Sequence, residues 1–109
     1  MKRHERLIAG ANGYSGMAAA ADIIIYTTPF CAYCHAAKDL LRRRAAPFIE
    51  IDVMTDPERR KEMTQRSGGG RTVPQIFIGE RLIGGFNELH ALERSGGLDN
   101  LLNQTNLAG

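Results

Sequence analysis

The sequence predicts an α/β domain built on a four-stranded mixed sheet, with its elements in the order β-α-β-α-β-β-α-α. A short apolar run rich in β-branched residues, Asp22 to Tyr26, is typical of a strand buried on both faces of a sheet. A helical pattern and a second strand pattern follow it, which together make a βαβ unit. Further along, two short apolar runs flank Gly79-Glu80 and indicate a tight antiparallel hairpin.

The βαβ unit spans Asp22 to Val53. After its first strand, apolar residues keep one-face helical spacing from Ala32 to Arg44, and we expect Lys38 on the solvent side of that helix. Pro47 ends the helix, and Phe48 to Val53 alternates as the second strand. A helical crossover of this kind makes the two strands parallel.

The second half of the domain begins with a helix and continues with the hairpin. Thr55-Asp56-Pro57-Glu58 is a helix start, with a capping residue and a proline in the first turn, and Gly68-Gly69-Gly70 ends that helix. The remaining expected elements are the hairpin strands Gln75 to Ile78 and Arg81 to Ile83, a helix from Phe86 to Ser95, and a short last helix around Leu98, Leu101 and Leu102.

Length and composition favour one folded domain over residues 22–104, a disordered extension over residues 1–21 and a frayed tail over residues 105–109. The net charge of +2 gives no basis for a nucleic-acid partner. No apolar run reaches the roughly eighteen residues of a membrane span. The apolar stretch Leu7-Ile8-Ala9 ends at Gly10, too short for a secretory signal, so we expect a cytoplasmic protein.

The chemistry of the chain centres on Cys31-Ala32-Tyr33-Cys34, which contains both of its cysteines. Because the motif stands where a strand gives way to a helix, Cys31 should lie at the helix N-terminus and Cys34 one turn inside. Unpaired N–H groups and the positive end of the helix dipole stabilise a thiolate at that first position. We therefore expect a dithiol redox site, with Cys31 as the nucleophile and Cys34 as the resolving thiol.

Two metal sites are alternative interpretations of the same cysteines. With His35 they match C-x-x-C-H, the pattern of c-type haem attachment, but here the pattern follows an expected buried strand in a chain that we expect not to be exported. A structural zinc site needs four ligands, and only His35 stands near the cysteines in the sequence. We predict no metal ligand from the residues alone.

Two further motifs suggest a binding groove. The bond before the proline of Thr72-Val73-Pro74 can be cis, which would turn the backbone of Val73 out of the sheet to pair with a peptide. The alternative is a proline that only marks a strand start. In Gly84-Gly85-Phe86-Asn87-Glu88 the glycines permit close approach and the helix N-terminus can hold a carboxylate, although such a pair often forms only a turn.

Together the three motifs resemble the signatures of dithiol glutaredoxins, and the similarity runs from about Asp22 to Gln104. The resemblance implies a thioredoxin-like fold, glutathione as cosubstrate, and a monomer that reduces protein disulfides and glutathionylated proteins. The resemblance implies that Cys31 attacks the disulfide of the substrate. The residues that would line the glutathione groove are Tyr33, Arg60, Thr72, Val73, Pro74, Gly85, Phe86, Asn87 and Glu88.

The resemblance also implies which end of glutathione each part of the groove would hold. Thr72 and Val73 would bind its cysteinyl backbone, Asn87 and Glu88 its γ-glutamyl end, and Arg60 its glycyl carboxylate.

The chain departs from the family pattern at two positions beside the cysteines. Thr28 stands where the family often has a lysine, so the thiolate of Cys31 would depend more on the helix. Ala32 replaces the proline that often follows the first cysteine, and a small residue there goes with binding of a [2Fe-2S] cluster between two protomers, through Cys31 and glutathione from each. A cluster-carrying dimer is thus the alternative function. A thioredoxin proper is disfavoured, because the chain has no tryptophan and lacks Trp-Cys-Gly-Pro-Cys.

Overall fold

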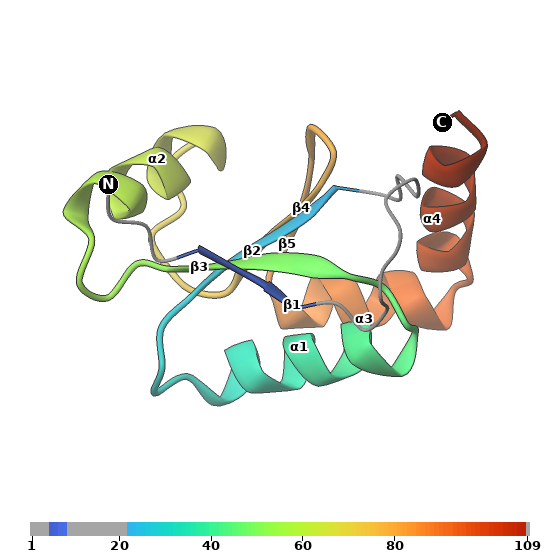
Figure 1. Cartoon of the computed structure of the whole chain (residues 1–109), viewed down its shortest axis with the longest axis horizontal. Helices are drawn as coiled ribbons and strands as arrows, with labels where there is room; N and C mark the ends of the chain where they lie inside the picture. The colour runs from blue at the N-terminus through green and yellow to red at the C-terminus, as the bar shows by residue number, and fades with distance from the viewer. Residues whose placement is uncertain (1–4, 9–21, 109) are drawn as a thin grey trace.

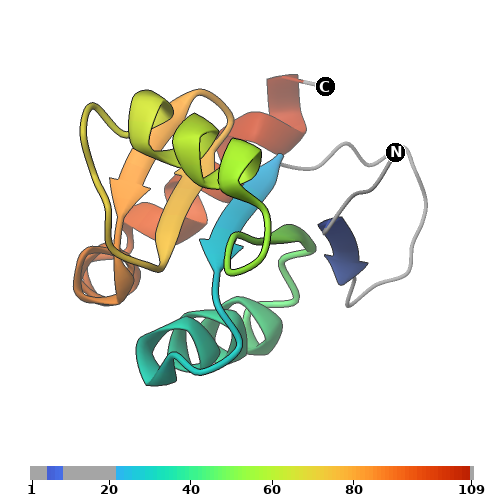
Figure 2. The same cartoon turned by 90° about the vertical axis from the view of Figure 1, so that its left-hand side faces the viewer.

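The computed structural model describes residues 5–8 and 22–108, with helices on both faces of a central sheet (Figures 1 and 2). The sheet has five strands in the order β1-β3-β2-β4-β5. Helices α1 and α3 lie on one face and α2 on the other (Figure 1). The elements are β1 Glu5–Ile8, β2 Ile23–Thr27, α1 Ala32–Arg43, β3 Phe48–Asp52, α2 Pro57–Arg66, β4 Gln75–Ile78, β5 Arg81–Gly84, α3 Phe86–Arg94 and α4 Gly97–Ala108.

The strands from β2 to β5 confirm the predicted mixed sheet. Ile24 of β2 lies opposite Ile49 of β3 in a parallel pair and opposite Phe77 of β4 in an antiparallel pair. The hairpin between β4 and β5 is also antiparallel, and Gly79 in its turn has φ 63°, a left-handed conformation that glycine adopts without strain. This arrangement places the carboxyl end of β2, where the cysteine motif begins, in the middle of the sheet.

The strand β1 lies in the segment that we expected to be disordered. It pairs antiparallel with β3, from Glu5 opposite Ile51 to Ile8 opposite Phe48. The sheet therefore has a fifth strand, and the prediction of disorder is wrong for these four residues. The outer edge of β3 offers unpaired backbone N–H and C=O groups with which a short segment can pair. Because this pairing is between distant parts of the chain, the sequence of residues 5–8 gives little indication of it. Residues 1–4 and 9–21 lie outside the described residues.

Helix α4 is longer than the sequence suggested. It continues through Ala108, so the prediction of a frayed tail is wrong for residues 105–108, and residue 109 lies outside the described residues. No glycine or proline interrupts the chain between Leu98 and Ala108, so nothing stops the helix early. Leu98 is buried, and Leu101 and Leu102 pack against the core, which anchors the first turns.

The sheet separates two apolar cores. Alternating residues of β4 show this, because Ile76 and Ile78 face α1 and α3 whereas Phe77 faces α2. The larger core contains Ile23, Ile25, Ala37, Leu40, Leu41, Ala46, Phe48, Ile76, Ile78, Leu89 and Leu98. The smaller one contains Tyr26, Ile51, Val53, Met63 and Phe77. Both faces of β2 are covered, as its continuous apolar pattern predicted.

The prediction for Lys38 is wrong, because this side chain is buried rather than on the solvent side of α1. Its ammonium lies 2.8 Å from a carboxylate oxygen of Glu50 on β3, and the hydroxyl of Thr27 donates to the same oxygen at 2.7 Å. The spacing of Cys34, Lys38 and Leu41 puts all three on one helix face. The ion pair makes the burial of a charge on that face tolerable.

Candidate active site

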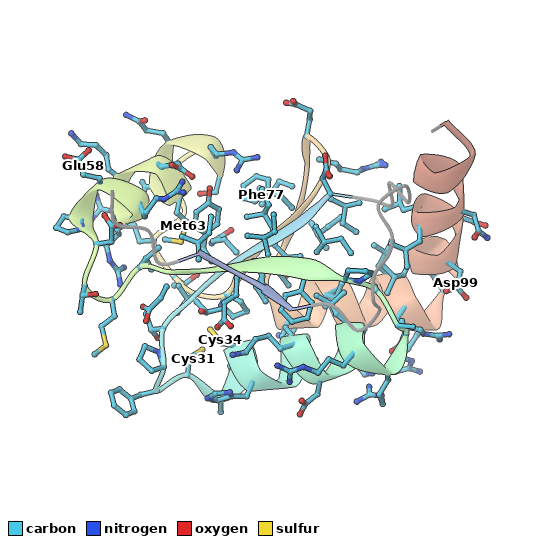
Figure 3. All side chains as sticks on the ribbon, viewed as in Figure 1. Cys31, Cys34, Glu58, Met63, Phe77 and Asp99 are labelled. Carbon is cyan, nitrogen blue, oxygen red and sulfur yellow. The ribbon has the colours of Figure 1, made fainter. Side chains whose placement is uncertain are left out.

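The two cysteines lie where β2 gives way to α1, as predicted, but in unequal surroundings (Figure 3). Cys31 is the N-cap residue of α1, and its Sγ accepts a hydrogen bond from the backbone N–H of Cys34 at 3.1 Å. Its side chain is half-buried, whereas Cys34 is completely buried. Only the first sulfur is open to an incoming disulfide while also facing the helix N-terminus.

The thiol of Cys34 is held in its protonated form. Burial raises the pKa of Cys34 to about 12, and the hydrogen bond with Cys31 acts in the same direction. The backbone of Thr28 and the charge of Lys38 act in the opposite direction without overcoming burial. Since a raised pKa favours the thiol at every pH below about 12, Cys34 is no nucleophile in the resting state.

The two thiols should differ in alkylation. When the reduced protein is treated with iodoacetamide at pH 8, we expect one adduct, on Cys31, because Cys34 is both buried and protonated. Intact-mass and peptide mass spectrometry measure this. Protein unfolded in urea is the control and should take two adducts. Equal labelling of both cysteines in the folded protein would contradict the asymmetry.

The second motif lies directly against Cys31. The Val73–Pro74 peptide bond is cis, and the carbonyl oxygen of Val73 accepts a hydrogen bond from the Sγ of Cys31 at 3.7 Å. The side-chain amide of Gln75 donates to the carbonyl of Thr72 at 3.1 Å, which ties this loop to β4. Pro74 is buried, whereas Thr72 is exposed. The loop therefore stands beside the sulfur with its Val73 carbonyl facing it.

The third motif, Gly84 to Glu88, lies next to the first two. A Cβ placed on Gly85 would lie 3.5 Å from the carbonyl oxygen of Pro74, so the start of α3 adjoins the cis-proline loop. The ring of Tyr33, which is 61% exposed, stacks on Phe86 with ring centroids 6.1 Å apart. Phe86 in turn stacks on His90 at 5.4 Å. Sequence motifs more than fifty residues apart thus meet around Cys31.

The two polar residues at the start of α3 are both exposed but differ in their contacts. Both Asn87 and Glu88 are exposed. A carboxylate oxygen of Glu88 accepts a hydrogen bond from the backbone N–H of Gly85 at 2.9 Å and so caps its own helix. Glu88 therefore has a structural contact that the sequence did not predict, while the side chain of Asn87 faces solvent.

Arg60 lies in a separate cleft rather than beside the cysteines. This cleft, of about 400 Å³, is lined by Pro57, Arg60, Lys61, Thr64 and Arg71. Its lining includes no residue of the cysteine motif or of α3, and it reaches the cis-proline loop only through Arg71, the neighbour of Thr72 in the sequence. Lys61 and Arg71 were not predicted from the sequence, although the position of Arg71 next to Thr72 was a signal. Three cationic side chains therefore surround this cleft.

The described part of the chain shows neither a metal-binding cluster nor a membrane-spanning helix. Within residues 5–8 and 22–108, no three side chains of His, Cys, Asp or Glu gather as they would to hold a metal ion. In the same ranges no helix has both the length and the apolar character to cross a membrane.

Comparison with known proteins identifies the family. The glutaredoxin family model matches residues 23–83, which is more than half of the chain. The chain belongs to the glutaredoxin family. It is 52% identical over 80 residues to a glutaredoxin of Pseudomonas aeruginosa, a match that covers 73% of this chain and 94% of the relative. It is 48% identical over 82 residues to glutaredoxin 3 of Escherichia coli, covering 75% and 98%.

Solved glutaredoxin structures share the fold. The solution structure of a glutaredoxin from Brucella melitensis is 53% identical, with a TM-score of 0.67 over 80% of this chain and 94% of the other. A buckwheat glutaredoxin solved as a complex with glutathione is 26% identical, with a TM-score of 0.71 over 78% and 79%. The thioredoxin-like α/β fold is therefore confirmed, and membership of this family gives the protein a thiol redox role as an oxidoreductase.

Proposed function

We propose that the protein is a glutathione-dependent disulfide oxidoreductase that reduces protein disulfides and glutathione mixed disulfides. The observation that carries this proposal is the inequality of its two sulfurs. Cys31 is half-buried and capped by the N–H of Cys34 at 3.1 Å, whereas Cys34 is buried and protonated. Attack by one sulfur and later resolution by the other is the chemistry that this inequality supports.

The proposed reaction follows two routes. In the monothiol route Cys31 attacks a glutathione mixed disulfide, takes the glutathionyl group and releases the other thiol, and a second glutathione then releases glutathione disulfide. In the dithiol route Cys31 attacks a protein disulfide, and Cys34 attacks the resulting mixed disulfide at Cys31. Two glutathione molecules then reduce the Cys31–Cys34 disulfide and leave as glutathione disulfide. The monothiol route consumes one free glutathione, because the other half of its glutathione disulfide comes from the substrate.

A groove for glutathione is part of the proposal. The cysteinyl backbone of glutathione would lie along Thr72 and Val73, beside Cys31, and its γ-glutamyl end would meet the start of α3 at Asn87. Support comes from the 3.7 Å distance between the Sγ of Cys31 and the carbonyl oxygen of Val73. A disulfide bound along Val73 would therefore lie within reach of the Cys31 sulfur. The buckwheat relative was solved as a glutathione complex. The glycyl carboxylate would lie toward Arg60 and its cationic neighbours, and the supply of reduced glutathione fits the proposed cytoplasmic location.

An electron-source experiment tests this function. The protein is given a glutathione mixed disulfide with NADPH, glutathione and glutathione reductase, and NADPH oxidation is followed by absorbance. We expect turnover that depends on glutathione. A parallel reaction replaces glutathione and its reductase with thioredoxin reductase and should give little turnover. Activity only in the second reaction would make the protein a thioredoxin in function and overturn the proposal.

Cluster binding is a second candidate, favoured by Ala32. This small, exposed residue follows Cys31 at the position where the family's cluster-binding members have small residues. One relative was solved as the holo form of poplar glutaredoxin C1. Each chain would contribute Cys31 and a bound glutathione, because Cys34 is buried. Purification without oxygen and with glutathione distinguishes the two states: a brown dimer supports this candidate, and a colourless monomer rejects it.

A further inference from the structure

A buried ion pair lies behind the cysteine motif and has no part in the routes above. The side chains of Lys38 and Glu50 are 11% and 9% exposed, with 2.8 Å between the ammonium and the carboxylate oxygen. The hydroxyl of Thr27 donates to the same oxygen at 2.7 Å. One carboxylate therefore connects the end of β2, the middle of α1 and the middle of β3. These elements carry and support Cys34.

Stability alone does not account for this pair. Removing two charges from water costs several kcal/mol per ion, and replacing a buried pair with apolar residues is often neutral or stabilising. The rest of the inner face of α1, with Ala37, Leu40 and Leu41, is apolar and packs in the larger core. An apolar residue at position 38 would continue that face. The buried charge of Lys38 is therefore better explained by a role in the chemistry of the cysteines than by stability.

The position of Lys38 relative to Cys34 indicates such a use. The two residues are four apart on α1, on successive turns of the same buried face. Cys34 must become a thiolate before it can resolve a mixed disulfide, although its surroundings strongly favour the thiol. A buried cation one helical turn away acts through a low-dielectric interior, where its attraction for an anion is several times that in water.

We propose that Lys38, held in place by Glu50 and Thr27, stabilises the transient thiolate of Cys34 and thereby sets the rate of the dithiol route. The inference rests on the proposed function. In the step concerned, the Cys34 thiolate attacks the sulfur of Cys31 in the mixed disulfide and forms the Cys31–Cys34 bond. The bond from Cys31 to the substrate breaks, and the substrate sulfur leaves with the electron pair and takes up the proton that Cys34 gave up.

Two assays on the same samples separate this role from a structural one. Reduction of insulin disulfides requires Cys34, whereas release of glutathione from a small mixed disulfide requires only Cys31. In the double variant Lys38→Met with Glu50→Gln, which removes both charges of the pair, we expect the insulin rate to fall about tenfold, because a correspondingly smaller fraction of Cys34 would be present as thiolate. The small-disulfide rate should change less than about twofold. Lys38→Arg keeps the charge and should recover most of the insulin rate.

The single variant Glu50→Gln gives a result of opposite sign. It removes the anion that offsets Lys38, so the insulin rate relative to the small-disulfide rate should rise, whereas damage to the fold would lower both rates. Arg43→Met, at an exposed cation on the same helix, is the matched control and should alter neither rate. Equal losses in both assays, an unchanged ratio in the double variant, or a lower ratio in Glu50→Gln would overturn the inference. Absence of both activities in the unaltered protein would instead refute the proposed function.

Discussion

Replacing Cys31 with serine should abolish both disulfide reduction and deglutathionylation. The hydroxyl of serine is not a nucleophile toward disulfides at neutral pH, and the other thiol of the chain, that of Cys34, is buried. We expect a loss on the order of 10³-fold or more, the scale seen when a catalytic nucleophile is removed. The glutathione-coupled NADPH assay measures this directly.

The Cys34→Ser variant is the matched control, because it removes the other sulfur of the motif. Serine fits the buried site of Cys34, and the N–H at position 34 can still donate to the Sγ of Cys31. Deglutathionylation should therefore continue, while reduction of insulin disulfides should fall strongly because the mixed disulfide can no longer be resolved within the protein. Activity retained by Cys31→Ser and lost by Cys34→Ser would reverse the two roles.

Replacing Phe77 with alanine should cause the largest loss of stability among single core changes in the smaller core. The ring, labelled in Figure 3, is 2% exposed. Its centroid lies 5.9 Å from that of Tyr26, which it meets edge-on, and 4.3 Å from the guanidinium carbon of Arg66. Removing the ring leaves a cavity and eliminates its contacts with Tyr26 and Arg66, so the free energy of unfolding should fall by about 3–5 kcal/mol. Urea unfolding followed by far-UV circular dichroism suits a chain without tryptophan.

The control for this experiment is Phe30→Ala. The ring of Phe30 is 85% exposed, so the same change of side chain there should alter the unfolding free energy by less than about 0.5 kcal/mol. A loss below about 1 kcal/mol for Phe77→Ala would show that α2 closes over the vacated space and that this core tolerates repacking. Comparable losses in the two variants would indicate an effect on the unfolded chain rather than on packing.

Local signals were sufficient for most of the fold. The apolar run of β2, Pro47 after α1, and the glycine in the hairpin turn each fix an element or its end within a few residues. The position of Cys31 at the N-terminus of α1 follows from the change of pattern at that point. These features depend on neighbours in the sequence, so the sequence alone could reveal them.

Features that depend on distant partners were not predictable in the same way. Strand β1 exists because β3 offers it an edge, and Glu5 and Ile51 are far apart in the sequence. Lys38 looked like a solvent-facing cation until Glu50, on another strand, supplied a carboxylate. Arg60 was assigned to the groove by resemblance alone, and the structure adds Lys61 and Arg71 around it. Each depends on which elements meet in space.

The pairing of β1 with β3 has a consequence for association between molecules. In the described sheet, β1 and β5 are the two lateral strands, so β3 presents no open backbone to another polypeptide. A protein shortened to begin at residue 22 would uncover the row of N–H and C=O groups from Phe48 to Ile51. Such a row is a template for strand addition by a second copy or a foreign peptide. The segment Glu5–Ile8 thus covers the edge of β3, and the lateral edge on this side of the sheet is reduced to the four residues of β1.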